Sequence, residues 1–162
     1  MGDAADAIME QWGAIRPELD SWPVGVVVRI FRAARHLEAG LKDYFTAHGL
    51  EPWEYDVLAT LLRSGEDGTL RMSDLAGAAM LTPGALTNRV NRLVARGLVT
   101  RETDTDNRRT VKTTLTDEGR RLAYDLIEGH FANELRLIDG LSREEQAQLA
   151  ALLRKLLISL GE

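Results

Sequence analysis

Apolar residues recur every third or fourth position along most of this 162-residue chain, which is the spacing of an amphipathic helix. Residues 23–48 show it clearly, with Ile30, Ala34, Leu37 and Leu41 on one face. The pattern predicts helices over residues 4–15, 23–48, 52–63, 73–80, 83–96, 117–138 and 143–160.

Residues that favour helix N-termini precede several of these segments. Thr82 is followed by a proline, Thr116 by two acidic residues, and Ser142 lies three residues before Glu145 as in a capping box. We also expect Ser73 to cap the helix that runs to about residue 80. The predicted helices are therefore separate elements with defined starts.

One stretch departs from the helical pattern. Residues 98–103 and 110–115 are both rich in β-branched side chains, which favour strands. The polar loop 104–109 between them carries Arg108 and Arg109. We therefore expect a β-hairpin with a basic tip.

The charge distribution is uneven. Residues 82–112 contain seven basic and three acidic residues, a net charge of +4, whereas the whole chain has a net charge of −5. A basic segment within an acidic body is typical of a surface that meets a polyanion such as DNA. The alternative is a basic helix face that is simply solvated.

Composition excludes several classes of protein. There are no cysteines, and His36, His48 and His130 are scattered without acidic residues at metal-ligand spacing. No nucleotide-binding glycine motif or recognisable nucleophile is present, so we expect neither an enzyme nor a bound metal or cofactor. No apolar run is long enough to span a membrane, and residues 1–12 do not resemble a signal peptide. We expect a soluble, cytoplasmic protein.

A helix, a turn, a second helix and a basic hairpin in succession predict a winged helix-turn-helix, whose second helix enters the major groove of DNA. The fold class expected is mainly α with a small β-wing. On the second helix, Leu86, Val90, Leu93 and Val94 form the inward set. The opposite side carries small, amide and basic side chains that suit base edges and phosphates. These are Gly84, Thr87, Asn88, Asn91 and Arg92, joined at the wing tip by Arg108 and Arg109.

The stretch of residues 81–120 reads LTPGALTNRVNRLVARGLVTRETDTDNRRTVKTTLTDEGR. It resembles the recognition helix and wing of the MarR (multiple antibiotic resistance regulator) family, and the similarity extends over about residues 25–160. The resemblance implies a homodimeric transcriptional regulator, a repressor in most cases, that binds a palindromic double-stranded operator and is released by a small ligand. It adds Thr82 to the expected DNA contacts. Asn88 stands where the family commonly has arginine, which bears on the operator sequence.

The resemblance also implies a domain organisation. Residues 1–48 would serve dimerisation and ligand binding, residues 49–115 would form the DNA-binding domain, and residues 116–162 would supply further dimerisation helices. The long apolar stripes of the terminal helices agree, because they exceed what the central module needs to cover itself. A monomeric helical core is the alternative.

Three further segments are similar to the urate-responsive branch of the family. They read QWGAIRPELDSWPVG, EPWEYDVLATLL and TNRVNRL. By this resemblance a tryptophan, an aspartate and two arginines govern the binding of urate, and the matching residues are Trp12, Asp56, Arg89 and Arg101. The residues also allow a simpler interpretation, in which Arg89 binds phosphate, Asp56 faces water and Trp12 staples the first helix to the body.

A protein–protein adaptor that uses the winged module without specific DNA binding is the rival hypothesis. The net charge of residues 82–112 argues against it, because an adaptor has no need of that charge. A steep dependence of DNA binding on salt would separate the two.

Overall fold

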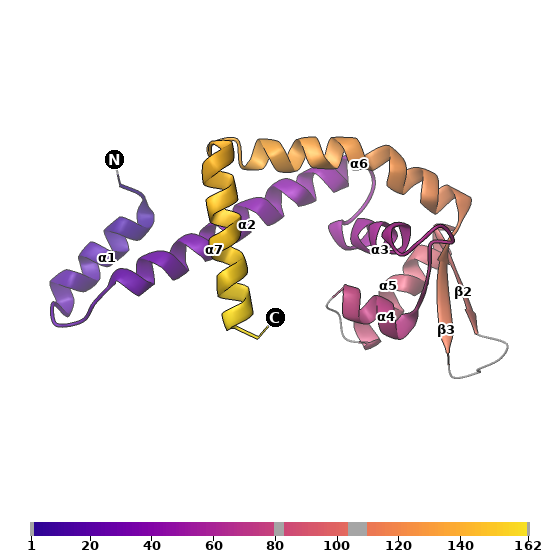
Figure 1. The fold of residues 1–162 in the computed structure, drawn as a ribbon, viewed down its shortest axis with the longest axis horizontal. Coiled ribbons are helices and arrows are strands. Elements are labelled where there is room, and N and C mark those ends of the chain that lie inside the picture. Colours follow the sequence, from indigo (N-terminus) through magenta and orange to yellow (C-terminus); the bar gives the residue numbers. More distant parts are fainter. Residues whose placement is uncertain (1, 80–82, 104–109, 162) are drawn as a thin grey trace. The chain divides into compact units, whose positions relative to one another are not determined.

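The computed structural model describes residues 2–79, 83–103 and 110–161 (Figure 1). These residues form seven helices and three strands. In chain order they are α1 (Ala4–Ile15), α2 (Trp22–Ala47), α3 (Pro52–Arg63), β1 (Thr69–Arg71), α4 (Met72–Ala78), α5 (Pro83–Ala95), β2 (Val99–Thr103), β3 (Val111–Leu115), α6 (Asp117–Leu137) and α7 (Arg143–Ser159). The chain divides into two compact units, residues 1–41 and residues 42–162.

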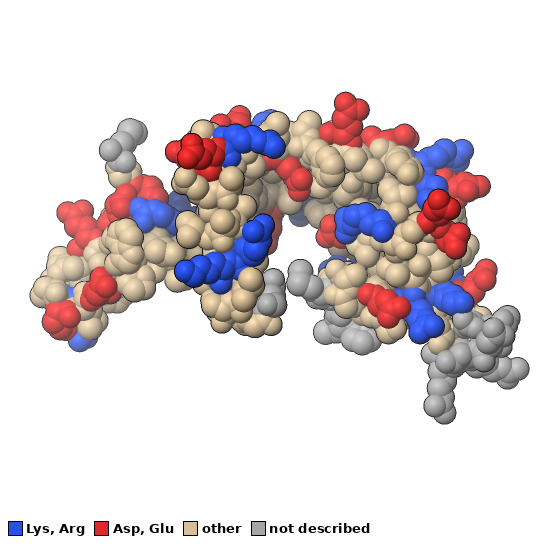
Figure 2. Space-filling model, viewed as in Figure 1, with Lys and Arg blue, Asp and Glu red and all other residues tan. Residues whose placement is uncertain are grey.

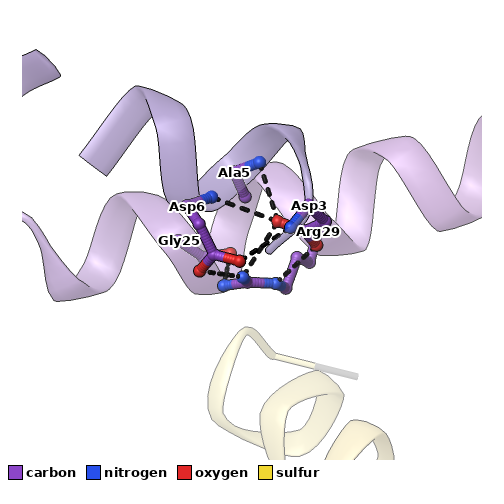
Figure 3. Close-up of polar contacts among 5 residues, drawn as sticks. All are labelled: Asp3, Ala5, Asp6, Gly25 and Arg29. Carbon is purple, nitrogen blue, oxygen red and sulfur yellow. Dashed lines mark hydrogen bonds and ion pairs between the residues drawn. The ribbon is translucent and has the colours of Figure 1, made fainter. Parts of the chain in front are cut away.

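In the first unit, α1 and the beginning of α2 form an antiparallel helical hairpin. Arg29 on α2 reaches the N-terminus of α1, where its Nε lies 2.9 Å from Asp3 Oδ2 and its Nη2 lies 2.7 Å from Asp6 Oδ1 (Figure 3). Asp3 also caps α1 by accepting from the backbone N–H of Ala5 at 2.8 Å. Farther along, Gly25 packs closely against α1, since a Cβ there would overlap Sδ of Met9 and would require that flexible side chain to move.

The Asp3 carboxylate is the centre of this contact. The hydrogen bond from the Asp6 backbone and the Arg29 guanidinium lower the pKa of Asp3 below its usual value of 3.8. All three side chains are exposed to a considerable degree, so water and salt screen the pairing. The contact therefore orients α1 on α2 rather than adding much to the free energy of unfolding.

The second unit is built on a three-stranded antiparallel sheet in the order β1-β3-β2. In this sheet Arg71 of β1 pairs with Lys112 of β3, and Arg101 of β2 pairs with Thr113 of β3. Helices α3, α4, α5 and α6 and the end of α2 pack around it and share one apolar core. The fully buried side chains of this core are Val57, Leu58, Leu61, Leu75, Leu86, Val90, Leu93, Val99 and Thr113.

A tight junction fixes the sheet to α5 and α6. Gly97 ends α5 with a φ of 70°, a left-handed conformation that favours glycine. Thr116 caps α6 by accepting from the backbone N–H of Gly119, and its own hydroxyl donates to the Gly97 carbonyl at 2.7 Å. Gly119 is confined as well, because a Cβ would overlap the carbonyl of Leu98. The position of the wing strands relative to α5 is thus set by backbone contacts.

The predicted fold class is confirmed, with three differences in detail. Strand β1 was not expected, because three residues are too few to show an alternating pattern. The prediction that Ser73 caps α4 is wrong: β1 leads directly into the helix, so the N-cap is Arg71. The inward placement of Val94 is also wrong, since its side chain is 40% exposed. Thr116 and Ser142 cap α6 and α7 as predicted.

Large apolar side chains remain exposed on the terminal helices. No residue of α7 is buried, although the helix has a continuous apolar stripe. Its exposed members are Leu149, Leu152, Leu153, Leu156 and Leu157, and Leu160 continues the stripe just beyond the helix. Trp22 and Phe31 of α2 are similarly exposed. Among the described residues, no helix is long and apolar enough to cross a membrane.

Candidate nucleic-acid interface and ligand pocket

Helix α5 has one buried and one open face. Leu86, Val90 and Leu93 anchor the helix in the core with no exposed surface. On the other side the residues expected to contact DNA lie open or half-open to solvent. Gly84, Asn88, Asn91 and Arg92 are exposed, and Thr87 is half-buried. Because the buried side is packed in the core, the open side presents its polar groups to solvent.

The base of the wing contacts this open face directly. Arg101 on β2 donates from Nη1 to Oδ1 of Asn91 on α5, over 3.1 Å. The bond holds the Asn91 amide so that its NH₂ group is left to donate elsewhere. Arg101 and Thr87 also line one shallow hollow between α5 and the sheet.

Basic side chains gather on the sheet near α4, as Figure 2 shows. Arg71 and Lys112 are partners across β1 and β3, and both are exposed. Arg71 and Ser73 line the same hollow as Arg101 and Thr87. Sequence reasoning missed Arg71, because the short strand that carries it was not recognised. Thr82, Arg108 and Arg109 lie outside the described residues.

A pocket of about 220 Å³ opens between α3, α4 and α5. Arg89 projects into it from α5, and Asp56 and Arg63 project from α3, with Trp53 and Thr60 completing its polar and aromatic wall. Arg89 is half-buried, as a charge beside the inward face of α5 should be. The pocket combines two guanidinium groups, a carboxylate and an indole ring, which suits a small planar anion.

Asp56 lies at the rim of this pocket, where it keeps contact with solvent. The surrounding protein removes enough water from its carboxylate to raise the pKa of Asp56 above the usual 3.8. Electrostatic interactions with His130, Arg63 and Arg89 lower the pKa of Asp56 and only partly offset this effect. An ionised Asp56 is therefore held at some cost to the folded state.

This cost predicts a pH-dependent effect of Asp56→Asn. A carboxyl whose pKa is raised by folding binds its proton more tightly in the folded state, so its contribution to stability falls as the pH rises above about 3.8. We expect the variant to be more stable than the wild type at pH 7, with a difference that disappears toward pH 4. Thermal unfolding of both proteins across this range tests it. A variant less stable at pH 7 would show that attraction to the arginines outweighs the desolvation.

Of the four residues expected to bind a ligand, the structure brings two into one pocket. Asp56 and Arg89 both line it. Arg101 instead lines the hollow on the wing side of α5. Trp12 belongs to the first unit, where its side chain is 50% exposed.

Sequence reasoning overlooked Trp53. Its ring lies under two arginines of α5, with the guanidinium carbon of Arg89 5.4 Å and that of Arg92 4.8 Å from the ring centroid. Both distances are within the range of cation–π attraction. The sequence shows only that Trp53 follows a proline at the start of a helix. This position does not indicate which side chains contact its ring.

A second overlooked contact ties α5 to α3. Glu54 is buried, and its Oε2 accepts from Nη1 of Arg96 at 2.8 Å and from the backbone N–H of Glu51 at 2.9 Å. Arg96 also donates to the Gly49 carbonyl at 3.1 Å. The C-terminal end of α5 is thereby fixed to the loop between α2 and α3.

Comparison with known proteins identifies the fold and family. The sequence profile of the MarR family matches residues 48–110. The HTH-type transcriptional regulator PecS of Dickeya dadantii is 35% identical over 146 residues, which cover 90% of this chain and 88% of PecS. The chain belongs to the MarR family. It is a winged-helix transcriptional regulator by this membership, and its relatives are regulators rather than enzymes.

Solved structures of the family agree with the fold. Sco3205, a MarR family regulator from Streptomyces coelicolor solved in complex with DNA, is 29% identical, with a TM-score of 0.78 over 85% of this chain and 86% of that one. BpsR of Bordetella bronchiseptica, whose DNA binding is regulated by 6-hydroxynicotinic acid, is 26% identical, with a TM-score of 0.71 over 82% of this chain and 91% of that one.

Proposed function

We propose that this MarR-family regulator is a homodimeric repressor that binds a palindromic operator through α5 and the wing and is released by a small aromatic anion such as urate. The observation that carries the proposal is the arrangement of α5, whose buried face is fixed in the core while its polar face lies open beside the wing. In this arrangement Gly84, Thr87, Asn88, Asn91 and Arg92, with Thr82, contact the major groove, and Arg108 and Arg109 contact the minor groove.

Dimer formation is supported by the exposed apolar stripes. Large apolar surfaces on a protein usually mark an interface, and α7 buries none of its leucines within its own chain. A two-fold dimer would present two copies of α5 to successive major grooves. Residues 1–48 and 116–162 would then form the dimer and residues 49–115 would bind DNA.

The ligand is assigned from the pocket between α3, α4 and α5. Its volume of about 220 Å³ is below the range of roughly 300–1,000 Å³ typical of drug-sized ligands, so a molecule of purine size fits it better. Arg89 would pair with the anion, and Asp56 would repel it and so move on binding. Arg101 and Trp12 complete the proposed ligand set by resemblance alone. BpsR, a relative regulated by an aromatic acid, is consistent with this class of ligand.

Replacement of Arg89 tests the ligand assignment. We expect Arg89→Ala to retain operator binding and to reduce the urate effect on the DNA dissociation constant by about tenfold, as the loss of a charge-assisted contact implies. Arg89→Lys keeps the charge and should retain part of the response. Fluorescence anisotropy of labelled operator, with and without urate, measures both quantities. Loss of DNA binding in Arg89→Ala would instead place Arg89 in the DNA contact or the fold.

A further inference from the structure

Trp53 stands between the pocket and the open face of α5. It is the second residue of α3 and packs against the apolar core, so its ring is held in place from behind. In front of it lie Arg89, which lines the pocket, and Arg92, which is exposed. A single side chain thus contacts one arginine from the proposed ligand site and one from the proposed DNA contact.

The ring of Trp53 lies within cation–π range of both arginines, which are close enough on α5 to repel each other. They are three residues apart on α5, so they are neighbours on its surface, and their like charges repel. Within residues 2–79, 83–103 and 110–161, no ion pair joins either guanidinium to a carboxylate. The negative face of the indole, at 5.4 Å from Arg89 and 4.8 Å from Arg92, attracts both.

We propose that Trp53 is a positioning residue that makes the orientation of Arg92 depend on the occupancy of the pocket. This rests on the proposed function of α5 and of the pocket. An anion paired with Arg89 neutralises one of the two charges that share the ring. Repulsion on Arg92 then falls, and the indole holds Arg92 more closely, away from the DNA phosphate that it would otherwise reach. Binding in the pocket therefore weakens DNA binding, which is the direction that release of a repressor requires.

The first test uses the free protein and needs no DNA. In nuclear magnetic resonance spectra, the ring current of Trp53 should displace the Nε–Hε signal of Arg92. We expect Trp53→Leu to abolish this displacement, Trp53→Phe to keep part of it, and urate to increase it in the wild type. An Arg92 signal that is the same in Trp53→Leu and in the wild type would overturn the proposal. So would a signal in the wild type that does not respond to saturating urate.

The second test measures coupling on DNA. Cation–π contacts of this kind correspond to about two- to fivefold in affinity, so we expect Trp53→Leu to reduce the ratio of the operator dissociation constants with and without urate by that factor. Trp53→Phe should give a smaller reduction, because it keeps an aromatic ring of similar bulk. In an Arg92→Ala background the same substitution should change the ratio very little. Additive effects of the two substitutions would contradict a shared contact.

Two controls separate loss of the Trp53 contact from loss of folding and from a general loss of positive charge. Thermal unfolding of each variant shows whether Trp53→Leu is still folded. If it is not, the Arg92 signal and the ratio of dissociation constants in Trp53→Phe, which keeps an aromatic ring, provide the test. Arg121→Ala removes an exposed arginine that pairs with Glu118 on α6, far along the chain from the pocket, and should leave the ratio unchanged. A wild-type protein that does not bind the operator would refute the proposed function, and with it any effect of Trp53 on DNA binding. The nuclear magnetic resonance signal of Arg92 would still show whether the Trp53 ring holds this arginine.

Discussion

Leu156→Glu is expected to convert the protein to a monomer and to weaken operator binding by about a hundredfold. Leu156 lies in the middle of the α7 stripe, whose leucines are exposed in the single chain, so the proposed dimer would bury it. A carboxylate in an apolar interface must be desolvated without a partner, which is costly. A monomer also places only one α5 on the operator, so the second set of contacts is lost. Light scattering and anisotropy on the operator measure the two effects.

The opposite face of α7 offers a matched control. Ala151 lies on the side of the helix away from the leucine stripe, and it is also exposed. Ala151→Glu introduces the same charge into the same helix and should leave a dimer with unchanged affinity for DNA. A dimer in Leu156→Glu as well would show that α7 is not the interface.

Arg96→Ala is expected to destabilise the fold by about 2–3 kcal/mol. The buried Glu54 carboxylate would lose the guanidinium that lies 2.8 Å away and keep only the backbone N–H of Glu51. Removal of one partner of a buried pair leaves an uncompensated charge, with a typical cost of about 3–5 kcal/mol. We expect less, because the Arg96 side chain is itself 41% exposed. Urea unfolding of the two proteins measures the difference.

Two variants distinguish burial of the carboxylate from simple loss of an arginine. Glu54→Gln in the Arg96→Ala background removes the unpaired charge and should recover much of the lost stability. Arg121→Ala breaks an Arg–Glu pair that is exposed on both sides, so its urea midpoint should match the wild type. Equal destabilisation by Arg96→Ala and Arg121→Ala would contradict the role assigned to the buried carboxylate.

The sequence predicts the architecture well where a pattern extends over many residues or depends only on neighbouring residues. The helical stripes, the capping residues Thr116 and Ser142, and the paired β-branched segments each arise from neighbouring residues, and the structure confirms them. Strand β1 escaped prediction because its pairing with β3 joins residues 69–71 to residues 112–114, far apart in the chain. Contacts of this kind leave no periodic pattern in so short a segment.

In the candidate site, too, features that arise from neighbouring residues could be predicted, whereas contacts between helices could not. The open face of α5 follows from helical spacing, since the buried positions Leu86, Val90 and Leu93 determine which residues face outward. The place of Trp53 beneath two arginines does not follow, because it depends on the angle between α3 and α5. Burial of Glu54 is likewise a consequence of tertiary packing, which overrides the usual preference of a carboxylate for the surface.

The most direct test of operator binding and its release is fluorescence anisotropy of the wild-type protein on the DNA upstream of its own gene, with and without urate, at several salt concentrations. We predict tight binding, with a dissociation constant on the order of 10⁻⁸ M or lower, that weakens steeply with salt and is released by urate. Tight binding that urate does not affect would retain the regulator and reject the ligand. The absence of any salt-sensitive binding would contradict the central claim and favour a protein–protein adaptor.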